Sequence, residues 1–394
     1  MRSIELFAGA GGLALGVENA GFKHVAVIEW DKHACSTIRA NGSMTAQMAS
    51  AWPVHQVDVR DFEFAHFRDN VQLVSGGPPC QPFSIGGKHR GQHDRRDMFP
   101  EAVRVVREVR PLAFVFENVR GLLRRSFAKY FQYILLQLQH PEVQKQGGEQ
   151  WPEHLRRLEK HHTKGNYRGL YYRTVFSLLN AADFGVPQRR ERVAIVGFRS
   201  DVCENWCFPN PTHSEDALLR EQWVTSEYWE RHKIAKKHRP SQPAGIEQRL
   251  GQLKFYADFQ PWRTVRDALC GLPEPSIRPN LKYQNHTLQP GARTYTGHTG
   301  SPFDEPAKTL KAGDHGVPGG ENMIAYPDGS VRYFTVRESA RLQTFPDWYL
   351  FNGSWTENMR QIGNAVPVRL AEIVGLSVKE SLIKHSFRVS DTKE

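Results

Sequence analysis

Cysteine and long apolar runs are both scarce in this chain of 394 residues. The five cysteines are too few for a disulfide framework, so we expect a reducing cytosol, in which a thiolate nucleophile survives. No run approaches the roughly 20 apolar residues that span a membrane. Met1-Arg2-Ser3 leads straight into a predicted strand, and we therefore expect no signal peptide. These absences argue against disulfide-stapled secreted proteins and membrane-spanning proteins.

Acidic residues are outnumbered by basic ones. Lysine and arginine total 52 against 42 aspartates and glutamates, which gives a net charge of +10 with histidine neutral. A basic surplus of this size favours a polyanionic partner. The length suggests two domains, or one large domain with an added module.

The first half of the chain alternates predicted strands and helices, which is the pattern of a parallel sheet. We expect strands over 3–6, 25–29, 55–57, 71–75, 113–117, 171–180 and 192–197, and helices over 13–20, 32–40, 100–109 and 130–138. Between 139 and 169 the pattern becomes polar and basic, and we interpret it as a surface insertion made of a solvated helix and loop. His161 and His162 within it are adjacent, so they do not share a face and do not predict a metal site.

The periodicity weakens from about residue 201 to 328, which predicts a second domain of short strands and loops. Cys203 and Cys207 have no second ligand pair at zinc-finger spacing, so we interpret them as structural. Order returns where Thr335 and Glu338 form a capping box for a helix through residue 342. A final helix is expected from Pro367 to about residue 384. The predicted domains are 1–200, 201–334 and a return segment, 335–394.

The most informative segment runs from Ser75 to Ser84 and contains Cys80. The apolar residues 71–74 predict a buried strand, which ends in two glycines followed by Pro78 and Pro79. The prolines hold the backbone extended. The thiol of Cys80 then lies at the carboxyl end of a strand, where open α/β sheets bind ligands. This position predicts a nucleophile, and a buried structural cysteine is the alternative.

A glycine-rich loop joins the first predicted strand to the first predicted helix. It allows a tight turn and a close approach of the backbone to a ligand at the helix N-terminus, although its spacing departs from the dinucleotide fingerprint. Glu29 ends the second strand and can bond ribose hydroxyls, while Trp30 can cover an adenine and Asp58 can accept from an exocyclic amine. Together these residues predict a nucleoside site, with ordinary caps and turns as the alternative. The loop residues concerned are Phe7, Gly9, Gly11 and Gly12.

A carboxylate and several arginines complete the candidate chemistry. Glu117 ends an apolar strand, and a partly buried glutamate can donate a proton near neutrality. Gln188, Arg190 and Arg192 alternate, so in a strand they would share one face. Converging guanidinium groups could hold Glu117 and activate the thiol. A strand edge with solvated arginines is the alternative.

A thiolate, a protonating glutamate, an arginine pair and an adenosine cofactor suit attack on an electron-poor ring. C5 of cytosine is not nucleophilic until a group adds at C6. A cysteine adduct at C6, with a glutamate near N3, gives an enamine that can take a methyl group at C5. Loss of the C5 proton then expels the cysteine.

These segments resemble, in order, those of the C5-cytosine DNA methyltransferases. The resemblance spans nearly the whole chain, and the Pro-Cys, Glu-Asn-Val and Gln-x-Arg-x-Arg segments are jointly very specific. The matching segments are Phe7-Ala8-Gly9-Ala10-Gly11-Gly12, Glu29-Trp30-Asp31, Gly77-Pro78-Pro79-Cys80-Gln81-Pro82, Glu117-Asn118-Val119, 188–192, Arg337-Glu338, Arg341-Leu342-Gln343 and Gly363-Asn364-Ala365-Val366-Pro367.

The resemblance implies an α/β fold with a Rossmann-like methyltransferase domain and a smaller, irregular target-recognition domain. It implies S-adenosylmethionine as cofactor, no metal, and a last helix that packs on the catalytic domain. Cys80 would be the nucleophile and Glu117 the acid, while Arg190 and Arg192 would orient Glu117 and the base. The implied cofactor residues are Phe7, Gly9, Gly11, Gly12, Glu29, Trp30, Asp58, Val59, Pro79, Asn364 and Val366.

The resemblance also implies how DNA is engaged. A base inside a duplex cannot reach Cys80, so the cytosine has to be flipped out or already unpaired. The loop after Cys80 is similar to the family's mobile loop, and its basic side chains predict salt-sensitive phosphate contacts. Specificity is expected in the irregular region, where one segment resembles the family's Thr-Leu element. The expected DNA-binding residues are Ser84, Lys88, Arg90, Arg95, Arg96, Thr309 and Leu310.

The leading hypothesis is a bacterial, cytoplasmic methyltransferase of double-stranded DNA that acts as a monomer, associates with the nucleoid through DNA and has no membrane partner. A cognate restriction endonuclease acting separately would make it half of a restriction-modification pair. A tRNA cytosine methyltransferase is one alternative, although a recognition region of about 130 residues (201–334) argues against it. A non-catalytic DNA-binding relative is another, although intact Cys80 and Glu117 argue against it.

Overall fold

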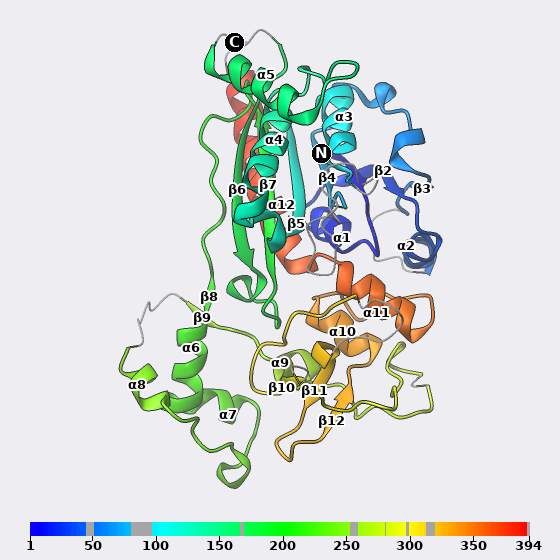
Figure 1. Cartoon of the computed structure of the whole chain (residues 1–394). Coiled ribbons are helices and arrows are strands. Elements are labelled where there is room, and N and C mark those ends of the chain that lie inside the picture. Colours follow the sequence, from blue (N-terminus) through cyan, green and yellow to red (C-terminus); the bar gives the residue numbers. More distant parts are fainter. Residues whose placement is uncertain are drawn as a thin grey trace. The chain divides into compact units, whose positions relative to one another are not determined.

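The computed structural model describes residues 1–44, 51–79, 97–165, 169–252, 259–279, 281–296, 299–312 and 320–391. The chain divides into two compact units, and each unit is built from separate stretches of sequence. The first unit comprises Met1–Leu179, Glu191–Pro209 and Ala371–Glu394, and the second comprises Asn180–Arg190 and Asn210–Leu370. Figure 1 shows the elements of both units in sequence colours.

A seven-stranded sheet organises the described part of the first unit, in the order β3-β2-β1-β4-β5-β7-β6. β1 to β5 run parallel to their neighbours, whereas β7 is antiparallel to β5. The order 3-2-1-4-5 is that of doubly wound α/β folds, which bind ligands beyond the carboxyl ends of the strands. The strands are β1 (Arg2–Leu6), β2 (Lys23–Glu29), β3 (Val54–Gln56), β4 (Leu73–Gly76), β5 (Ala113–Val119), β6 (Tyr172–Asn180) and β7 (Glu191–Arg199).

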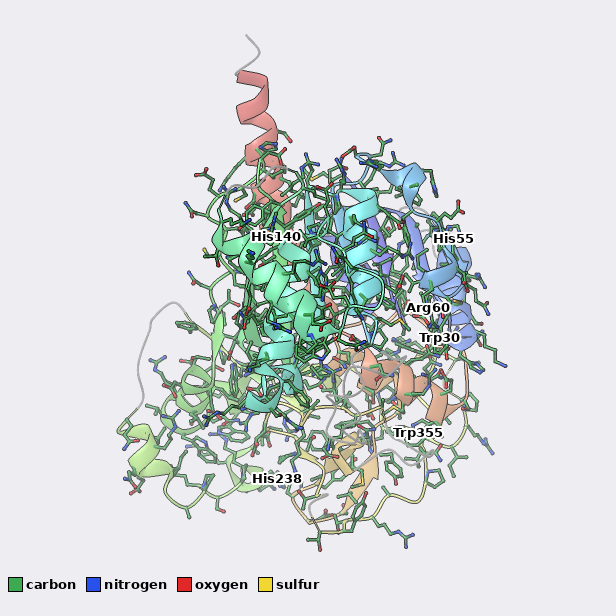
Figure 2. The ribbon with its side chains drawn as sticks, turned by 45° about the horizontal axis from the view of Figure 1, so that its top comes forward. Trp30, His55, Arg60, His140, His238 and Trp355 are labelled. Atoms are coloured by element: carbon green, nitrogen blue, oxygen red, sulfur yellow. The ribbon has the colours of Figure 1, made fainter. Side chains whose placement is uncertain are left out.

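Helices cover this sheet, and α3 and α4 lie over one of its faces (Figure 1). The helices are α1 (Gly12–Asn19), α2 (Lys32–Met44), α3 (Phe99–Val109), α4 (Ala128–Gln139), α5 (Trp151–Thr163) and, from Ala371 onward, α12 (Val368–Asp391). Figure 2 shows Trp30 and Arg60, which follow β2 and β3, on the same side of the first unit. The amide of Val57 donates to the carbonyl of Glu29 at 3.0 Å, which ties these two strand ends together.

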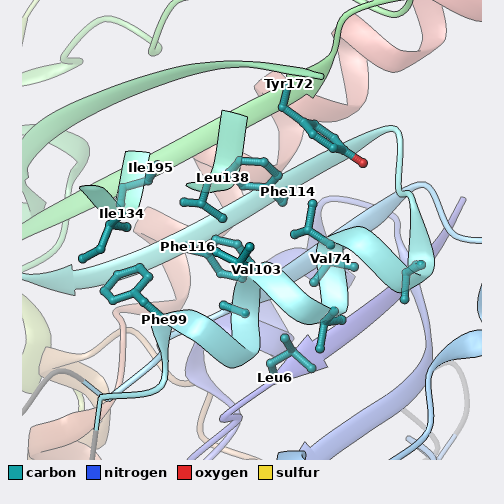
Figure 3. Packing of buried hydrophobic residues seen from close by; sticks show 14 of the residues in the cluster. Leu6, Val74, Phe99, Val103, Phe114, Phe116, Ile134, Leu138, Tyr172 and Ile195 are labelled. Atoms are coloured by element: carbon teal, nitrogen blue, oxygen red, sulfur yellow. The ribbon is translucent and has the colours of Figure 1, made fainter. Parts of the chain in front are cut away.

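The main hydrophobic core fills the space between the sheet and the helices α3 and α4 (Figure 3). Alternate residues of each strand point to the same face, so Leu6, Val74 and Phe116 meet side chains such as Phe99 and Ile134. All of these side chains are almost completely buried. The core therefore fixes the relative positions of β1, β4 and β5, whose carboxyl ends carry the candidate site.

The predicted strands and helices of the first half are confirmed to within a few residues. The insertion differs from the expectation of a solvated helix and loop. It contains α5, but Leu155 and Leu158 of this helix are buried in the main core, and the Trp151 ring packs on Tyr130 and Tyr133. The spacing of the two leucines places them on one face. The insertion is therefore partly structural.

The second unit is largely irregular, as predicted. Among its described residues, two small sheets combine β8 with β9 and β10 with β11 and β12. The capping box is confirmed, because the side chains of Thr335 and Glu338 each accept from the other's backbone amide. The elements are β8 (His213–Ser214), α6 (Glu215–Arg220), α7 (Glu227–Arg231), α8 (Ile246–Leu250), β9 (Gln260–Pro261), α9 (Val265–Leu269), β10 (Ser301–Pro302), β11 (Met323–Ala325), β12 (Val331–Tyr333), α10 (Val336–Leu342) and α11 (Trp355–Asn364).

The division into units differs from the predicted boundaries at 200 and 334. Residues 180–190 and 335–370 belong to the second unit. The reason is visible at Arg337, a fully buried side chain of α10 that donates to the carbonyls of Gln284, Pro346 and Tyr349. These bonds hold α10 within the second unit, so the return to the first unit begins only within α12.

The C-terminal part of α12 packs on the first unit. Gly375 lies against Ala20 at the end of α1, and Trp206 donates from Nε1 to the hydroxyl of Ser377 at 3.2 Å. This is the packing that the family resemblance implies. In the described part of the chain, no helix combines the length and the apolar character needed to cross a membrane.

Candidate active site

The carboxyl ends of β4 and β5 bring Glu117 to the segment that leads into Cys80. A Cβ atom built on Gly77 would lie 3.3 Å from Oε2 of Glu117. Asn118 donates from Nδ2 to the carbonyl of Pro78 at 2.9 Å. The two strands are parallel neighbours, so these contacts follow from the strand order. Cys80, the expected nucleophile, lies outside the described residues.

The described chain resumes close to the point where it stops before Cys80. The amide of Met98 donates to the carbonyl of Pro79 at 3.0 Å, so Pro79 and Met98 lie next to each other. Pro79 itself is exposed. Five of the expected DNA-binding residues also lie outside the described part of the chain, namely Ser84, Lys88, Arg90, Arg95 and Arg96.

Arg192 holds Glu117 in place. Its Nε lies 2.6 Å from Oε1 of Glu117, and the two side chains are only 11% and 14% exposed. The antiparallel register of β5 and β7 pairs Glu117 with Ala194 and Val119 with Arg192, which brings the guanidinium group across to the carboxylate. A charge-assisted contact of this kind fixes the orientation of the acid. The expected contact is present, and its catalytic role stays a prediction.

Arg190 has other partners than the resemblance suggested. Its guanidinium group is fully buried and donates to the carbonyls of Leu310 at 2.9 Å, Gly363 at 2.7 Å and Ala365 at 2.8 Å. The prediction that Gln188, Arg190 and Arg192 share a strand face is wrong. β7 begins only at Glu191, and Gln188 lies in the irregular segment before it.

The turn that carries Asn364 is tightly constrained within the second unit. A Cβ atom on Gly363 would lie 2.3 Å from the amide nitrogen of Ala312, so the two backbones touch. Gln343 donates from Nε2 to the carbonyl of Ile362 at 2.8 Å, in addition to the bonds from Arg190. Asn364 is exposed and Val366 is buried. The turn therefore presents the Asn364 side chain from a fixed backbone.

The glycine-rich loop adopts the strained geometry of a ligand-binding turn. Phe7, Gly9 and Gly11 all have positive φ angles, of 54°, 53° and 82°. Left-handed backbone is costly for a phenylalanine and often marks a functional site. The loop ends at Gly12, the first residue of α1, and no described side chain caps this helix. Its first amides are therefore free to donate hydrogen bonds to a negatively charged ligand group.

Glu29 ties the glycine-rich loop to the end of β2. Its Oε2 accepts from the amide of Gly9 at 2.7 Å, and its Oε1 accepts from the amides of Trp30 and Asp31. Burial of this carboxyl raises its pKa. The Trp30 side chain next to it is 73% exposed, which leaves an aromatic face open beside the loop. The predicted roles of both residues toward a nucleoside stay predictions.

Asp58 is paired with a neighbouring arginine. Arg60 donates from Nε to Oδ1 of Asp58 at 2.9 Å, and this hydrogen bond lowers the pKa of the carboxyl group. The carboxylate is thus kept ionised and positioned as an acceptor. Val59, which follows it, is buried, and its carbonyl accepts from Arg104 at 2.7 Å. The sequence did not identify Arg60 or Arg104 as supports of this site.

Glu5 is a second feature that sequence reasoning missed. It lies in β1 and is fully buried, and the hydroxyl of Ser75 in β4 donates to its Oε2. Its Oε1 has no hydrogen-bond partner among the described residues. Burial raises the pKa of Glu5 to about 8. The sequence did contain a signal for this residue, because an acid between the apolar Ile4 and Leu6, directly before the glycine-rich loop, is unusual in a buried strand.

The Thr-Leu element of the second unit is anchored by the segment before β7. The Thr309 hydroxyl donates to the carbonyl of Arg189 at 2.6 Å, and the amide of Leu310 donates to Oε1 of Gln188 at 2.9 Å. The Leu310 side chain is only 1% exposed. The Leu310 side chain thus packs inside the unit, and the expected DNA-binding role of Thr309 and Leu310 stays a prediction. No cluster of three or more metal-ligating side chains occurs among the described residues.

Comparisons with known proteins agree with this arrangement. The chain is 32% identical to the Type II methyltransferase M.PspPI of Psychrobacter sp. (strain TA137), over 95% of this chain and 78% of the relative. It is also 32% identical to the Type II methyltransferase M.NgoMIV of Neisseria gonorrhoeae, over 98% of this chain and 99% of the relative. The similarity to both relatives thus extends over almost the whole chain.

Solved structures show the same fold. A prophage-encoded putative DNA modification methyltransferase of Escherichia coli aligns with a TM-score of 0.60 at 21% identity, over 98% of this chain and 99% of that chain. The Dnmt2 methyltransferase of S. pombe aligns with a TM-score of 0.54 at 17% identity, over 98% of each chain. The sequence profile of the C-5 cytosine-specific DNA methylases matches residues 1–142 and 154–380. The chain therefore belongs to the C-5 cytosine-specific DNA methylase family.

Proposed function

We propose that this chain transfers a methyl group from S-adenosylmethionine to C5 of cytosine within one short sequence of duplex DNA. The observation that carries the proposal is the position of Glu117. This acid is held by Arg192 at 2.6 Å and lies against Gly77, three residues before Cys80. Family membership supports the reaction, and this contact supports Glu117 as its acid because it lies beside the segment that leads into Cys80.

The first unit offers a fitting site for the cofactor. The left-handed backbone of Phe7 and Gly9, the uncapped start of α1 and the unpartnered buried oxygen of Glu5 all suit a nucleoside carrying an amino acid. Glu29, Trp30 and Asp58 would hold its ribose and adenine, with Asn364 as a further cofactor residue. The bound cofactor supplies an electrophilic methyl group on its sulfonium sulfur.

The residues of the chain would then act on the flipped cytosine. The Cys80 thiolate adds to C6, while Glu117 donates a proton to N3 and so prevents negative charge from accumulating on the ring. Arg192 holds the carboxyl group of Glu117 in the orientation that reaches N3 of the ring. After C5 has gained its methyl group, a base removes the C5 proton, the C5–C6 double bond re-forms as the Cys80 thiolate leaves, and N3 returns its proton to Glu117.

The relatives' designation as Type II methyltransferases supports a role as the modification enzyme of a restriction-modification system. A cognate endonuclease acting separately, a monomeric state and a bacterial cytoplasmic location belong to the same proposal. The basic surplus of the chain, a net charge of +10, supports a nucleic-acid substrate.

The test is methylation of mixed-sequence genomic DNA by the purified protein and S-adenosylmethionine, read by base-resolution sequencing of 5-methylcytosine. We expect methylation confined to one short motif, and we expect Cys80→Ala to abolish it while S-adenosylhomocysteine still binds. Residual turnover of Cys80→Ala well above background would remove Cys80 as the nucleophile. Methylation of total tRNA but not of DNA would replace DNA with tRNA as the substrate.

A further inference from the structure

A group of positive side chains follows β5 directly after the candidate acid. The segment from Arg120 to Lys129 contains four basic residues and no acidic one. It forms two short 3-10 turns, Arg120–Leu123 and Arg125–Phe127, before α4 begins at Ala128. The basic residues are Arg120, Arg124, Arg125 and Lys129, here called the β5 patch, and all of them are exposed.

Most of this charge is not neutralised. Arg120 pairs with Glu191 at 2.6 Å, although its side chain stays 68% exposed. The side chains of Arg124, Arg125 and Lys129 have no hydrogen-bond or ion-pair partner in the described part of the chain. The nearby carboxylate of Asp97 already accepts from the Tyr130 hydroxyl and the Phe99 amide.

An uncompensated cluster of this kind is unfavourable for the protein on its own. Like charges close together repel, and Lys129 lies in the first turn of α4, where the helix dipole disfavours a cation. Such a cluster is typical of a surface that meets a polyanion. Nothing in the core requires these side chains, because they point into solvent while Leu122 between them is buried.

The location of the β5 patch indicates which polyanion it meets. The patch begins three residues after Glu117, at the same end of the sheet where Gly77 and Pro78 contact β5. A duplex whose flipped base reaches Glu117 has backbone phosphates on both sides of that base. The β5 patch lies at the end of the sheet that carries Glu117, which is the end that a flipped base would have to reach.

We propose that the β5 patch binds the phosphodiester backbone of DNA flanking the target cytosine. The inference rests on the proposed function and adds a binding surface outside the loop after Cys80 and outside the second unit. Because phosphates carry no base identity, these contacts position the duplex and do not select its sequence.

The test compares two triple variants with equal loss of charge. The patch variant carries Arg124→Gln, Arg125→Gln and Lys129→Gln. The control variant carries Arg156→Gln, Lys160→Gln and Lys164→Gln, which remove three exposed cations on α5 and the turn after it. Binding of each protein to a mixed-sequence duplex is measured with S-adenosylhomocysteine present, at several salt concentrations.

We expect the patch variant to bind DNA at least tenfold more weakly at low salt. The slope of log K against log salt should become shallower by about 0.9 for each phosphate that is no longer neutralised, hence by about 1 to 3. The control variant should keep the parental slope. Arg124→Lys with Arg125→Lys should also keep it, because the charge remains.

Equal slopes for the parent and the patch variant would overturn the proposal, as would equal reductions of affinity in the patch and control variants. S-adenosylhomocysteine binding reports whether each variant is folded. If the triple patch variant does not fold, the single changes Arg124→Gln and Lys129→Gln provide the same comparison. The readout is binding rather than methyl transfer, so failure of the proposed reaction would be seen separately.

Discussion

Glu5 is an ionisable side chain buried in the middle of a sheet. A carboxylate is costly to bury without partners, and only one of its oxygens accepts from Ser75. The protein therefore favours the protonated form, which is why burial raises the pKa to about 8. The position between Ile4 and Leu6 links this acid to the strand that leads into the glycine-rich loop.

The raised pKa makes stability depend on pH. Below the ordinary value of 4.5 the group is protonated in both states, and it has no effect. Between that value and about 8 the unfolded chain loses the proton while the folded protein retains it, so the free energy of unfolding falls as pH rises. We predict that Glu5→Gln removes this dependence. Between pH 5.5 and pH 8, the free energy of unfolding of the variant should rise by about 2 to 3 kcal/mol relative to that of the parent.

The measurement is thermal or urea unfolding of parent and variant at both pH values. Glu63→Gln serves as the matched control, because it removes one carboxyl group in the same way at a side chain that is exposed. A Glu5→Gln effect that is the same at pH 5.5 and pH 8 would contradict the prediction.

At the scale of elements, Arg190 joins two parts of the second unit. One guanidinium group bonds the carbonyl of Leu310, in the Thr-Leu element, and the carbonyls of Gly363 and Ala365, on either side of Asn364. Its planar fork of donors suits several fixed acceptors at once, whereas a lysine ammonium is a single point of charge. Arg190 is thus a positioning residue for the Asn364 turn.

We predict that Arg190→Lys weakens S-adenosylhomocysteine binding about tenfold, the factor that corresponds to 1.4 kcal/mol. Loss of buried hydrogen bonds from a charged donor should also lower stability by about 1.5 to 3 kcal/mol. Calorimetric titration and thermal unfolding measure the two effects. The neighbouring control Arg189→Lys changes a side chain that is 46% exposed, and it should be nearly neutral. Equal behaviour of the two variants would remove the positioning role.

Elements with a strong local signal could be predicted from the sequence, and long-range contacts could not. Short apolar runs marked β1, β4 and β5, and the Thr335 capping box marked the start of α10. The burial of the insertion helix α5 could not be predicted from its sequence, because Leu155 and Leu158 stand among polar residues. Both leucines are nevertheless buried. The helix α11 did have a local signal that our predictions did not use: Ser354 and Glu357 have the spacing of a capping box, and the Ser354 hydroxyl accepts from the amide of Glu357 at 3.3 Å.

The candidate site was predictable in its residue types and less so in its contacts. The pairing of Arg192 with Glu117 followed from the motif, and the antiparallel register of β5 and β7 explains it. The partners of Arg190 are 120 to 175 residues away in sequence, and no local pattern specifies them. The contacts of Arg60 with Asp58 and of Arg104 with the Val59 carbonyl could not be predicted either, because arginines are common along the chain.

At the scale of the whole molecule, neither unit is a continuous piece of chain. The first unit lacks a finished fold until residues from Ala371 onward have joined it, because Val374, Val378 and Leu382 of α12 are buried. Burial of each such side chain is worth about 1.5 to 3 kcal/mol. Three of them amount to much of the stability of an ordinary domain, which is about 5 to 15 kcal/mol.

We predict that a chain ending at Leu370 has an unstable first unit and does not bind S-adenosylhomocysteine. A chain ending at His385 keeps every one of these buried positions and should bind normally. Thermal unfolding and calorimetric titration test both chains. Full cofactor affinity in the chain that ends at Leu370 would show that α12 is dispensable for this unit.

Because the first unit is discontinuous, its parts are synthesised at different times. The strands β1 to β7 leave the ribosome early, but Gly375, which packs against Ala20 of α1, is made after residues 210–370. At roughly 5 to 20 residues per second this delay lasts about 10 to 30 s. During that time the first unit lacks the buried side chains of α12, and apolar surface left exposed in an incomplete fold is prone to aggregation. A chain that stops before Leu382 is therefore expected to stay inactive, because its first unit lacks the last of these buried side chains.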